Sequence, residues 1–279
     1  EQTRLDHLLE AAKELGKPAK IHLQLETGMN RLGLTKSEVE SVAQTLTQNR
    51  DLFELVGVCT HFAGAERVAN HVRVTNQFDV YHERLAQLGA HDLHPTFRHV
   101  SSSAATIAYP HARLDMVRIG ILQYGFWPST ERLMGYLGEN DIESDPLEPV
   151  ITWKSKVMGV QDVEAGTFVG YGNSYLARDA MKVALVPVGY ADGFARSLSN
   201  HGRVLINEHR ATVVGKVSMN MLTADVTEVP QTSKGDEVVL IGEQGDVSIS
   251  VAPFGERKDR MNYERLTKLS TRIPRTVVD

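Results

Sequence analysis

The first half of the chain alternates between segments of helical and strand-like patterning, which limits the possible folds more than any other feature. Apolar residues recur at helical spacing over residues 5–15, and residues 20–26 then alternate as a strand does. A second helix pattern, headed by the capping-box pair Thr35 and Glu38, leads into a buried strand at residues 55–59. This alternation predicts β/α units around a parallel sheet.

Two further units continue the pattern. A helix with an apolar stripe from Phe78 to Leu88 is closed by Gly89. Apolar runs at residues 97–101 and 116–124 follow, with a helical turn between them. About four β/α units are therefore expected, and they fit either a doubly wound sheet or part of a (β/α)8 barrel.

Polar residues recur at the same place in successive units and favour the barrel. His61 ends one strand, Ser102 and Ser103 end the next, and Arg31 follows a third. Barrel active sites are assembled on the carboxyl ends of the strands. Because a whole barrel takes eight strands and roughly 250 residues, only about half of one is expected here.

The pattern changes at residues 143–149, a polar stretch with two prolines of the kind that separates domains. The β-type runs expected after it lie at residues 150–163, 182–188, 203–206, 211–217 and 237–241. The predicted fold class is thus α/β, with part of a (β/α)8 barrel at residues 1–145 followed by a mostly β domain at residues 146–279.

Composition narrows the function classes. A net charge of −5 argues against nucleic acid as a partner, and no apolar run is long enough to span a membrane. Cys59 is the single cysteine, which excludes an intrachain disulfide and fits a reducing, cytoplasmic compartment. His91 and His94 lie in a polar loop without a third ligand, so no metal site is predicted.

Taken singly, the candidate residues have simple explanations. Residues 170–172 (GYG) suit a tight turn, and His61 suits a hydrogen-bonded structural histidine. Arg31 suits a solvated surface charge, Arg118 a surface ion pair, and Tyr190 an aromatic core position. No single residue decides the function.

Taken in chain order, the motifs resemble the successive signatures of the alanine racemase family. In the first half these are residues 26–33 (ETGMNRLG), 60–63 (THFA), 102–105 (SSAA), 116–121 (MVRIGI) and 124–125 (YG). In the second half they are residues 170–172 (GYG), 188–193 (VGYADG), 215–220 (GKVSMN) and 272–275 (RIPR). The resemblance covers nearly the whole chain.

This resemblance implies an isomerase that racemises an amino acid, most of all alanine, with pyridoxal 5'-phosphate (PLP) as cofactor. Racemisation removes the Cα proton and returns one to the opposite face, so two bases are needed, while PLP delocalises the negative charge. The family further implies a cytoplasmic homodimer with shared active sites that makes a D-amino acid for the cell wall. Small amino acids are the expected ligands.

The resemblance also assigns roles to residues. Tyr171 is implied as one base, reaching into the partner's site, and His61 and Arg118 as the groups that help it act. A phenol in water has a pKa of about 10, so nearby positive charge or hydrogen bonds are needed for it to act as a base near neutrality. Arg118 also matches the arginine facing the cofactor's pyridine nitrogen, where a guanidinium donates a hydrogen bond without losing its proton.

Further positions match cofactor and substrate contacts. Ser103, Gly120 and Ile121 match residues that hold the phosphate through hydroxyl and backbone N–H groups. The implied contacts of the substrate carboxylate are Arg31, Tyr190 and Met219.

Four features depart from the family pattern. The lysine that binds PLP covalently, which is also the second base, has no match, so we expect the chain alone to be inactive. Ser102 stands where Asn is usual, Asn220 where Asp is usual, and Thr271, at a cofactor-binding position, where Tyr is usual. These differences leave the substrate open, with serine or a broader set as alternatives to alanine.

Two other classes of protein are alternatives. A non-catalytic remnant of the family would keep the fold, but it has no physical need for Tyr171, His61 and Arg118 together. A related decarboxylase would use a cysteine in the β domain, whereas Cys59 lies in the barrel part. The racemase is therefore the favoured prediction.

Overall fold

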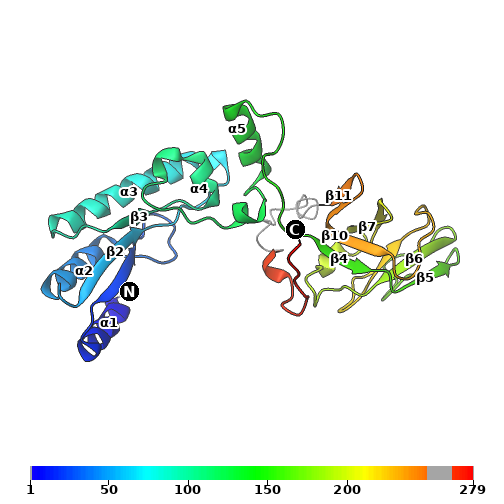
Figure 1. The fold of residues 1–279 in the computed structure, drawn as a ribbon, viewed down its shortest axis with the longest axis horizontal. Coiled ribbons are helices and arrows are strands. Elements are labelled where there is room, and N and C mark those ends of the chain that lie inside the picture. Colours follow the sequence, from blue (N-terminus) through cyan, green and yellow to red (C-terminus); the bar gives the residue numbers. More distant parts are fainter. Residues whose placement is uncertain (1, 250–265, 279) are drawn as a thin grey trace. The chain divides into compact units, whose positions relative to one another are not determined.

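A computed structural model describes residues 2–249 and 266–278 (Figure 1). The chain forms two compact units, Glu1–Leu147 and Glu148–Asp279. Within the described ranges, no helix combines the length and the apolar character that a membrane crossing requires.

The first unit is a three-stranded parallel sheet with helices between its strands, which confirms the predicted α/β class. The strands are β1 (Ala19–Gln24), β2 (Phe53–Cys59) and β3 (Phe97–His99), in the order β1-β2-β3. The helices are α1 (Gln2–Leu15), α2 (Lys36–Gln48), α3 (His71–Ala90), α4 (Ser103–Ala108) and α5 (Thr130–Asn140). Short 3-10 helices are η1 (Val68–Asn70), η2 (Pro110–Ala112) and η3 (Ile121–Tyr124).

Local sequence explains these helices. The capping box predicted for α2 is confirmed, because the Thr35 N–H donates to Glu38 Oε2 at 2.8 Å. The apolar stripe of α2 is buried against the sheet, and so is Tyr81 of α3, whose hydroxyl donates to the Val58 carbonyl at 2.9 Å. The helix α3 runs one residue beyond Gly89, to Ala90.

The carboxyl ends of the strands carry the polar residues singled out in the sequence. His61 follows β2 by two residues, and Ser102 and Ser103 follow β3. The apolar run at residues 116–124, which was expected to supply the strand of a fourth unit, does not form a strand over that length. Residue 118 forms a single parallel bridge with Ser102, and the chain then turns into η3, so the fourth unit pairs over one residue only.

The second unit is mostly β, as predicted, and its ladders are antiparallel. One sheet has the order β11-β10-β7-β8, with β4 also paired to β10, and the other has the order β5-β6-β9. The strands are β4 (Trp153–Lys156), β5 (Gly159–Val163), β6 (Met181–Val186), β7 (Arg203–Ile206), β8 (His209–Thr212), β9 (Leu222–Asp225), β10 (Glu237–Gln244) and β11 (Val247–Ile249). A further 3-10 helix is η4 (Arg196–Leu198).

The strand predicted at residues 211–217 has different limits in the structure. Asn207 and Glu208 both have positive φ and form the tight two-residue turn between β7 and β8, so β8 begins at once with His209. It ends at Thr212, and Val213 makes only an isolated bridge.

Candidate active site

Arg118 joins the ends of two strands in the first unit. Its Nη1 donates to His99 Nδ1 at 2.7 Å and to the His99 carbonyl at 2.9 Å. Its Nη2 donates to the carbonyls of Thr60 at 2.7 Å and Val100 at 3.3 Å. No carboxylate forms an ion pair with Arg118 among residues 2–249 and 266–278, so a surface ion pair does not explain this arginine.

Two histidines extend this contact across the sheet. His99 Nε2 lies 2.9 Å from His22 Nδ1, and β2 runs between the strands that carry these two residues. Opposite His22 on β2 is Gly57, where an added Cβ would collide with the His22 ring, so glycine makes room for it. Burial, the charge of Arg118 and the nearby His22 lower the pKa of His99 to about 4.

His61 lies beside the same guanidinium. Its Nδ1 is 3.5 Å from Arg118 Nη2. Burial lowers the pKa of His61 from its ordinary value, the positive charges of Arg118 and Arg31 lower it further, and Glu66 opposes them. The imidazole is therefore neutral near pH 7 and can accept a hydrogen bond. Arg31 itself is exposed.

The residues expected to hold a phosphate also meet in the first unit. The Gly120 N–H donates to Ser103 Oγ at 2.8 Å, which brings a hydroxyl and a backbone N–H together. Ile121 begins η3 directly after Gly120, and its side chain is buried.

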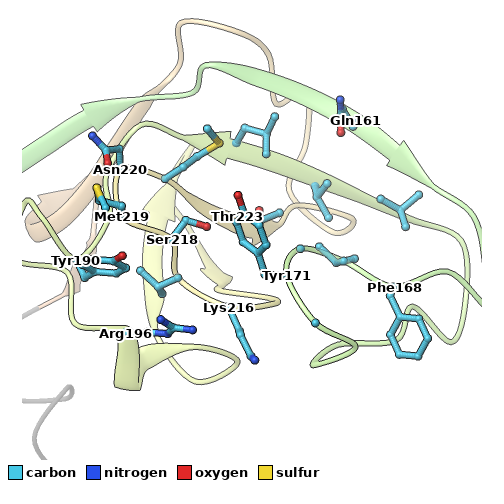
Figure 2. Close-up of a pocket in the computed structure, with 18 residues that line it drawn as sticks. Gln161, Phe168, Tyr171, Tyr190, Arg196, Lys216, Ser218, Met219, Asn220 and Thr223 are labelled. Carbon is cyan, nitrogen blue, oxygen red and sulfur yellow. The ribbon is translucent and has the colours of Figure 1, made fainter.

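The second unit contains a pocket of about 1020 Å³ (Figure 2). Three predicted site residues, Tyr171, Tyr190 and Met219, line it, as does Asn220. Figure 2 shows the pocket residues converging from several loops and from the face of the β5-β6-β9 sheet. Lys216 and Arg196 also line the pocket and give it positive charge.

Glycines shape the loop that presents Tyr171. Gly170 and Gly172 on either side have φ of +74° and +56°, the left-handed region that glycine adopts without strain. Asn200 ties this loop to the next one, since its Nδ2 donates to the Ser174 carbonyl at 2.9 Å and its Oδ1 accepts from the Gly215 N–H at 2.7 Å. The Tyr171 side chain is left 73% exposed.

Tyr190 and Met219 are held together by backbone contacts. The Tyr190 N–H donates to the Ser218 carbonyl at 3.0 Å, and the Ala191 N–H donates to the Met219 carbonyl at 2.9 Å. A Cβ at Gly189 would collide with the same two carbonyl groups, so this close approach requires glycine.

Thr271 lies near the turn that carries Tyr190 but does not line the pocket. The Ser270 N–H donates to the Asp192 carbonyl at 3.3 Å, and a Cβ on Gly193 would come within 2.7 Å of the Lys268 carbonyl oxygen. Thr271 itself is exposed.

The predicted site residues thus form two groups, one in each unit. Sequence reasoning missed His99 and His22, because both lie outside the family motifs and their contact depends on the order of the strands. It also missed Lys216 and Arg196, because a cation in a polar loop carries no distinctive signal. Of the two histidines weighed as metal ligands, His91 contacts Glu40 Oε1 through its Nε2 at 2.9 Å, and His94 Nε2 lies 3.5 Å from Asp92 Oδ1.

Each of the two units matches a known protein family model. The model of the "Alanine racemase, N-terminal domain" matches residues 1–128, and that of the "Alanine racemase, C-terminal domain" matches residues 150–277. The alanine racemase of Leptospira interrogans is 38% identical over 263 residues, which are 93% of this chain and 66% of that protein. The chain therefore spans about two thirds of the length of the curated relatives it matches.

Solved structures of alanine racemases also superimpose on this chain. The alanine racemase of the D-cycloserine producer Streptomyces lavendulae superimposes with a TM-score of 0.91 at 29% identity, covering 100% of this chain and 71% of that one. The alanine racemase of Bartonella henselae, solved with covalently bound pyridoxal phosphate, gives 0.80 at 26% identity, covering 99% of this chain and 71% of that one.

Proposed function

We propose that this chain, which belongs to the alanine racemase family, supplies cofactor-holding and proton-transfer residues to a PLP-dependent amino-acid racemase. Alanine is the leading substrate. The family's lysine motif has no match in these 279 residues, so the activity assays use the intact protein.

The hydrogen bonding of Arg118 carries the proposal. A guanidinium has five N–H groups, and the four on its Nη atoms are taken up by His99, Thr60 and Val100. The Nε–H has no hydrogen-bond partner within the described part of the chain. This leaves one oriented donor that fits a ring-nitrogen acceptor such as that of PLP, and Ser103 and Gly120 fit its phosphate.

Arg118 would orient the cofactor without protonating it. Bound PLP supplies an electron sink that makes the Cα–H bond of an amino acid acidic. Because a guanidinium keeps its protons, Arg118 donates a hydrogen bond to the ring nitrogen and leaves that nitrogen unprotonated. An unprotonated ring nitrogen withdraws electron density less strongly than a protonated one. The weaker electron withdrawal still permits racemisation and limits side reactions.

Proton transfer on one face is assigned to the Tyr171 hydroxyl. The neutral imidazole of His61 can accept a hydrogen bond from a phenol, and Arg118 lies next to that imidazole. The high exposure of Tyr171 suits a side chain that serves a site outside its own unit, as a homodimer with shared sites requires. Arg31, Tyr190 and the Met219 backbone are proposed to hold the substrate carboxylate.

The test is Tyr171→Phe in the intact protein, with Tyr136→Phe on α5 as the matched control. Loss of the phenol hydroxyl should lower racemisation of L- and D-alanine by at least about a hundredfold, the range of a lost general base. PLP absorbance should stay unchanged, and Tyr136→Phe should retain full activity. A loss of less than threefold, or an intact protein that does not racemise alanine or serine, would contradict the proposal.

The assembly and setting are part of the same proposal. A homodimer in the cytoplasm that supplies a D-amino acid for the cell wall is what the family membership suggests. Mixing the inactive Tyr171→Phe protein with an inactive Arg118→Ala protein should restore activity in hybrid dimers, because one of the two shared sites is then intact.

A further inference from the structure

Gln77 is a polar residue buried in the core of the first unit. It lies on the inner face of α3 and is 1% exposed. Its Oε1 accepts from the Ala63 N–H at 2.8 Å, and its Nε2 donates to the His61 carbonyl at 3.1 Å and to Thr27 Oγ1 at 3.2 Å. Both amide hydrogens are therefore used, and the side chain is hydrogen-bonded to the backbone on both sides of Phe62, at the His61 carbonyl and the Ala63 N–H.

The proton positions in this cluster follow from the partners. Thr60 Oγ1 donates its single hydrogen to the Leu25 carbonyl at 2.9 Å. In the 2.8 Å contact between the Thr27 and Thr60 hydroxyls, Thr27 must then be the donor. Thr27 Oγ1 in turn accepts from Gln77, so the chain of hydrogen bonds runs in one direction, from α3 through both hydroxyls to the end of β1.

The orientation of the Gln77 amide is fixed as well. The Ala63 N–H needs an acceptor and the His61 carbonyl needs a donor, so exchanging the amide oxygen and nitrogen would place like groups against each other. Only a side chain with both an acceptor and a two-hydrogen donor satisfies all three contacts.

This cluster joins two loops of the proposed active site. One is the loop that carries Arg31, and the other carries His61. Arg73, one turn before Gln77 on α3, donates to the Gly28 carbonyl at 3.0 Å and thus holds the first loop from the same helix. Thr60 is shared with the guanidinium site, because its carbonyl accepts from Arg118 at 2.7 Å.

We propose that Gln77 is a positioning residue for racemisation, which holds the His61 and Arg31 loops at a fixed separation. The inference rests on the proposed function. Gln77 touches neither substrate nor cofactor, and it acts through the backbone of residues 61–63 and through Thr27. A misplacement of about 1 Å at a reacting group can cost about a hundredfold in rate. Loss of the Gln77 hydrogen bonds should therefore lower the turnover rate while the fold persists.

The experiment compares Gln77→Glu and Gln77→Leu in the intact protein. Glutamate keeps the acceptor for the Ala63 N–H but, when ionised, has no donor for the His61 carbonyl or for Thr27. Its protonated form regains one donor, and burial raises the pKa of such a carboxyl group. We expect kcat of both variants to fall between tenfold and a hundredfold at pH 8. As the pH is lowered to 6, kcat of Gln77→Glu relative to wild type should recover, whereas that of Gln77→Leu should not.

The control is Gln87→Leu on the same helix, where the side-chain oxygen accepts from Arg84 Nη1 at 3.4 Å. Thr27→Val, which breaks the link to the Arg31 loop, should raise KM more than it lowers kcat. Amide exchange in residues 60–65 should speed up in both Gln77 variants and stay unchanged in Gln87→Leu. If Gln77→Leu does not fold, Gln77→Glu carries the test alone.

Unchanged exchange in residues 60–65, or kcat within twofold of wild type at both pH values, would overturn the inference while wild-type racemisation still supports the proposed function. A wild-type protein without racemase activity would instead overturn the proposed function, and amide exchange would still report whether Gln77 clamps the loop.

Discussion

Arg118 fixes the tautomer of His99 through the 2.7 Å hydrogen bond between Arg118 Nη1 and His99 Nδ1. An arginine can only donate, so Nδ1 of His99 is the acceptor and its proton sits on Nε2. That Nε2–H donates across 2.9 Å to His22 Nδ1, which puts the proton of His22 on Nε2 too. The His99 imidazole is therefore neutral while the guanidinium is in place.

The low pKa of His99, about 4, predicts a loss of stability in mild acid. A histidine in the unfolded chain titrates near 6.5. Above that pH neither state binds the proton, so the full stability is present. As the pH falls from 6.5 toward 4, His99 binds a proton in the unfolded chain but not yet in the folded chain. Proton binding therefore stabilises the unfolded state, and the free energy of unfolding falls by on the order of 3 kcal/mol.

His99→Asn isolates this effect. Asparagine can offer Arg118 an acceptor in place of Nδ1 but does not titrate. Urea unfolding of the intact protein between pH 7.5 and pH 4 should show a smaller fall in the free energy of unfolding for the variant than for wild type, because contributions of the carboxyl groups cancel in the comparison. Parallel pH profiles would show that His99 is not held neutral.

Arg118→Lys should cost both stability and rate. An ammonium has three hydrogens and no planar fork, so it cannot serve the four acceptors on His99, Thr60 and Val100 and still offer a donor to the cofactor ring. Leaving a buried acceptor unpaired costs about 1–3 kcal/mol of stability. Thermal unfolding and alanine racemisation should both decline, and Arg113→Lys, on an exposed arginine, is the matched control. Wild-type rates in Arg118→Lys would argue against the assigned role.

Local patterns in the sequence predicted most of the elements, because periodicity and caps act over a few residues, but helix α5 was not predicted. The Thr35–Glu38 capping box and the strand ending at Cys59 are examples. The strands β9 and β11 were missed because each is short, at four and three residues, and carries polar residues. The turn at Glu208 was missed because glutamate gives no signal for positive φ.

The candidate site was predictable only in part for a different reason. Family motifs marked Arg118 and His61, but the histidine contact joins residues 77 positions apart and depends on the order of the strands. Nothing local indicates that Gly57 leaves room for His22. The buried hydrogen bonds of Gln77 could not be predicted from the sequence either, since a glutamine on an amphipathic helix ordinarily faces solvent.

Gly189→Ala should separate Tyr190 from Met219. The new methyl group would collide with backbone carbonyls, which cannot move aside as a flexible side chain does. The two hydrogen bonds that join these segments contribute about 1 kcal/mol each, so thermal unfolding should show a loss of at least about 2 kcal/mol. Gly159→Ala in β5, where a Cβ meets nothing within 4 Å, should be nearly neutral. Equal stability of the two variants would show that the turn adapts.

The substitutions at Asn220 and Thr271 predict relaxed substrate specificity in the intact protein. Asn220 lines the pocket without the negative charge that is usual there, and Thr271 is small and exposed where the family usually carries a phenol. The kcat/KM values for alanine, serine, lysine and arginine should therefore lie closer together than in a strict alanine racemase. Thr271→Tyr restores the phenol at this proposed cofactor-binding position, and it should raise the preference for alanine about tenfold, the scale of a steric difference next to a substrate. Thr276→Tyr, at an exposed threonine five residues further on, should leave the preference unchanged. Strict selectivity for alanine in the wild type, or equal effects of the two tyrosine variants, would show that these positions do not set the specificity.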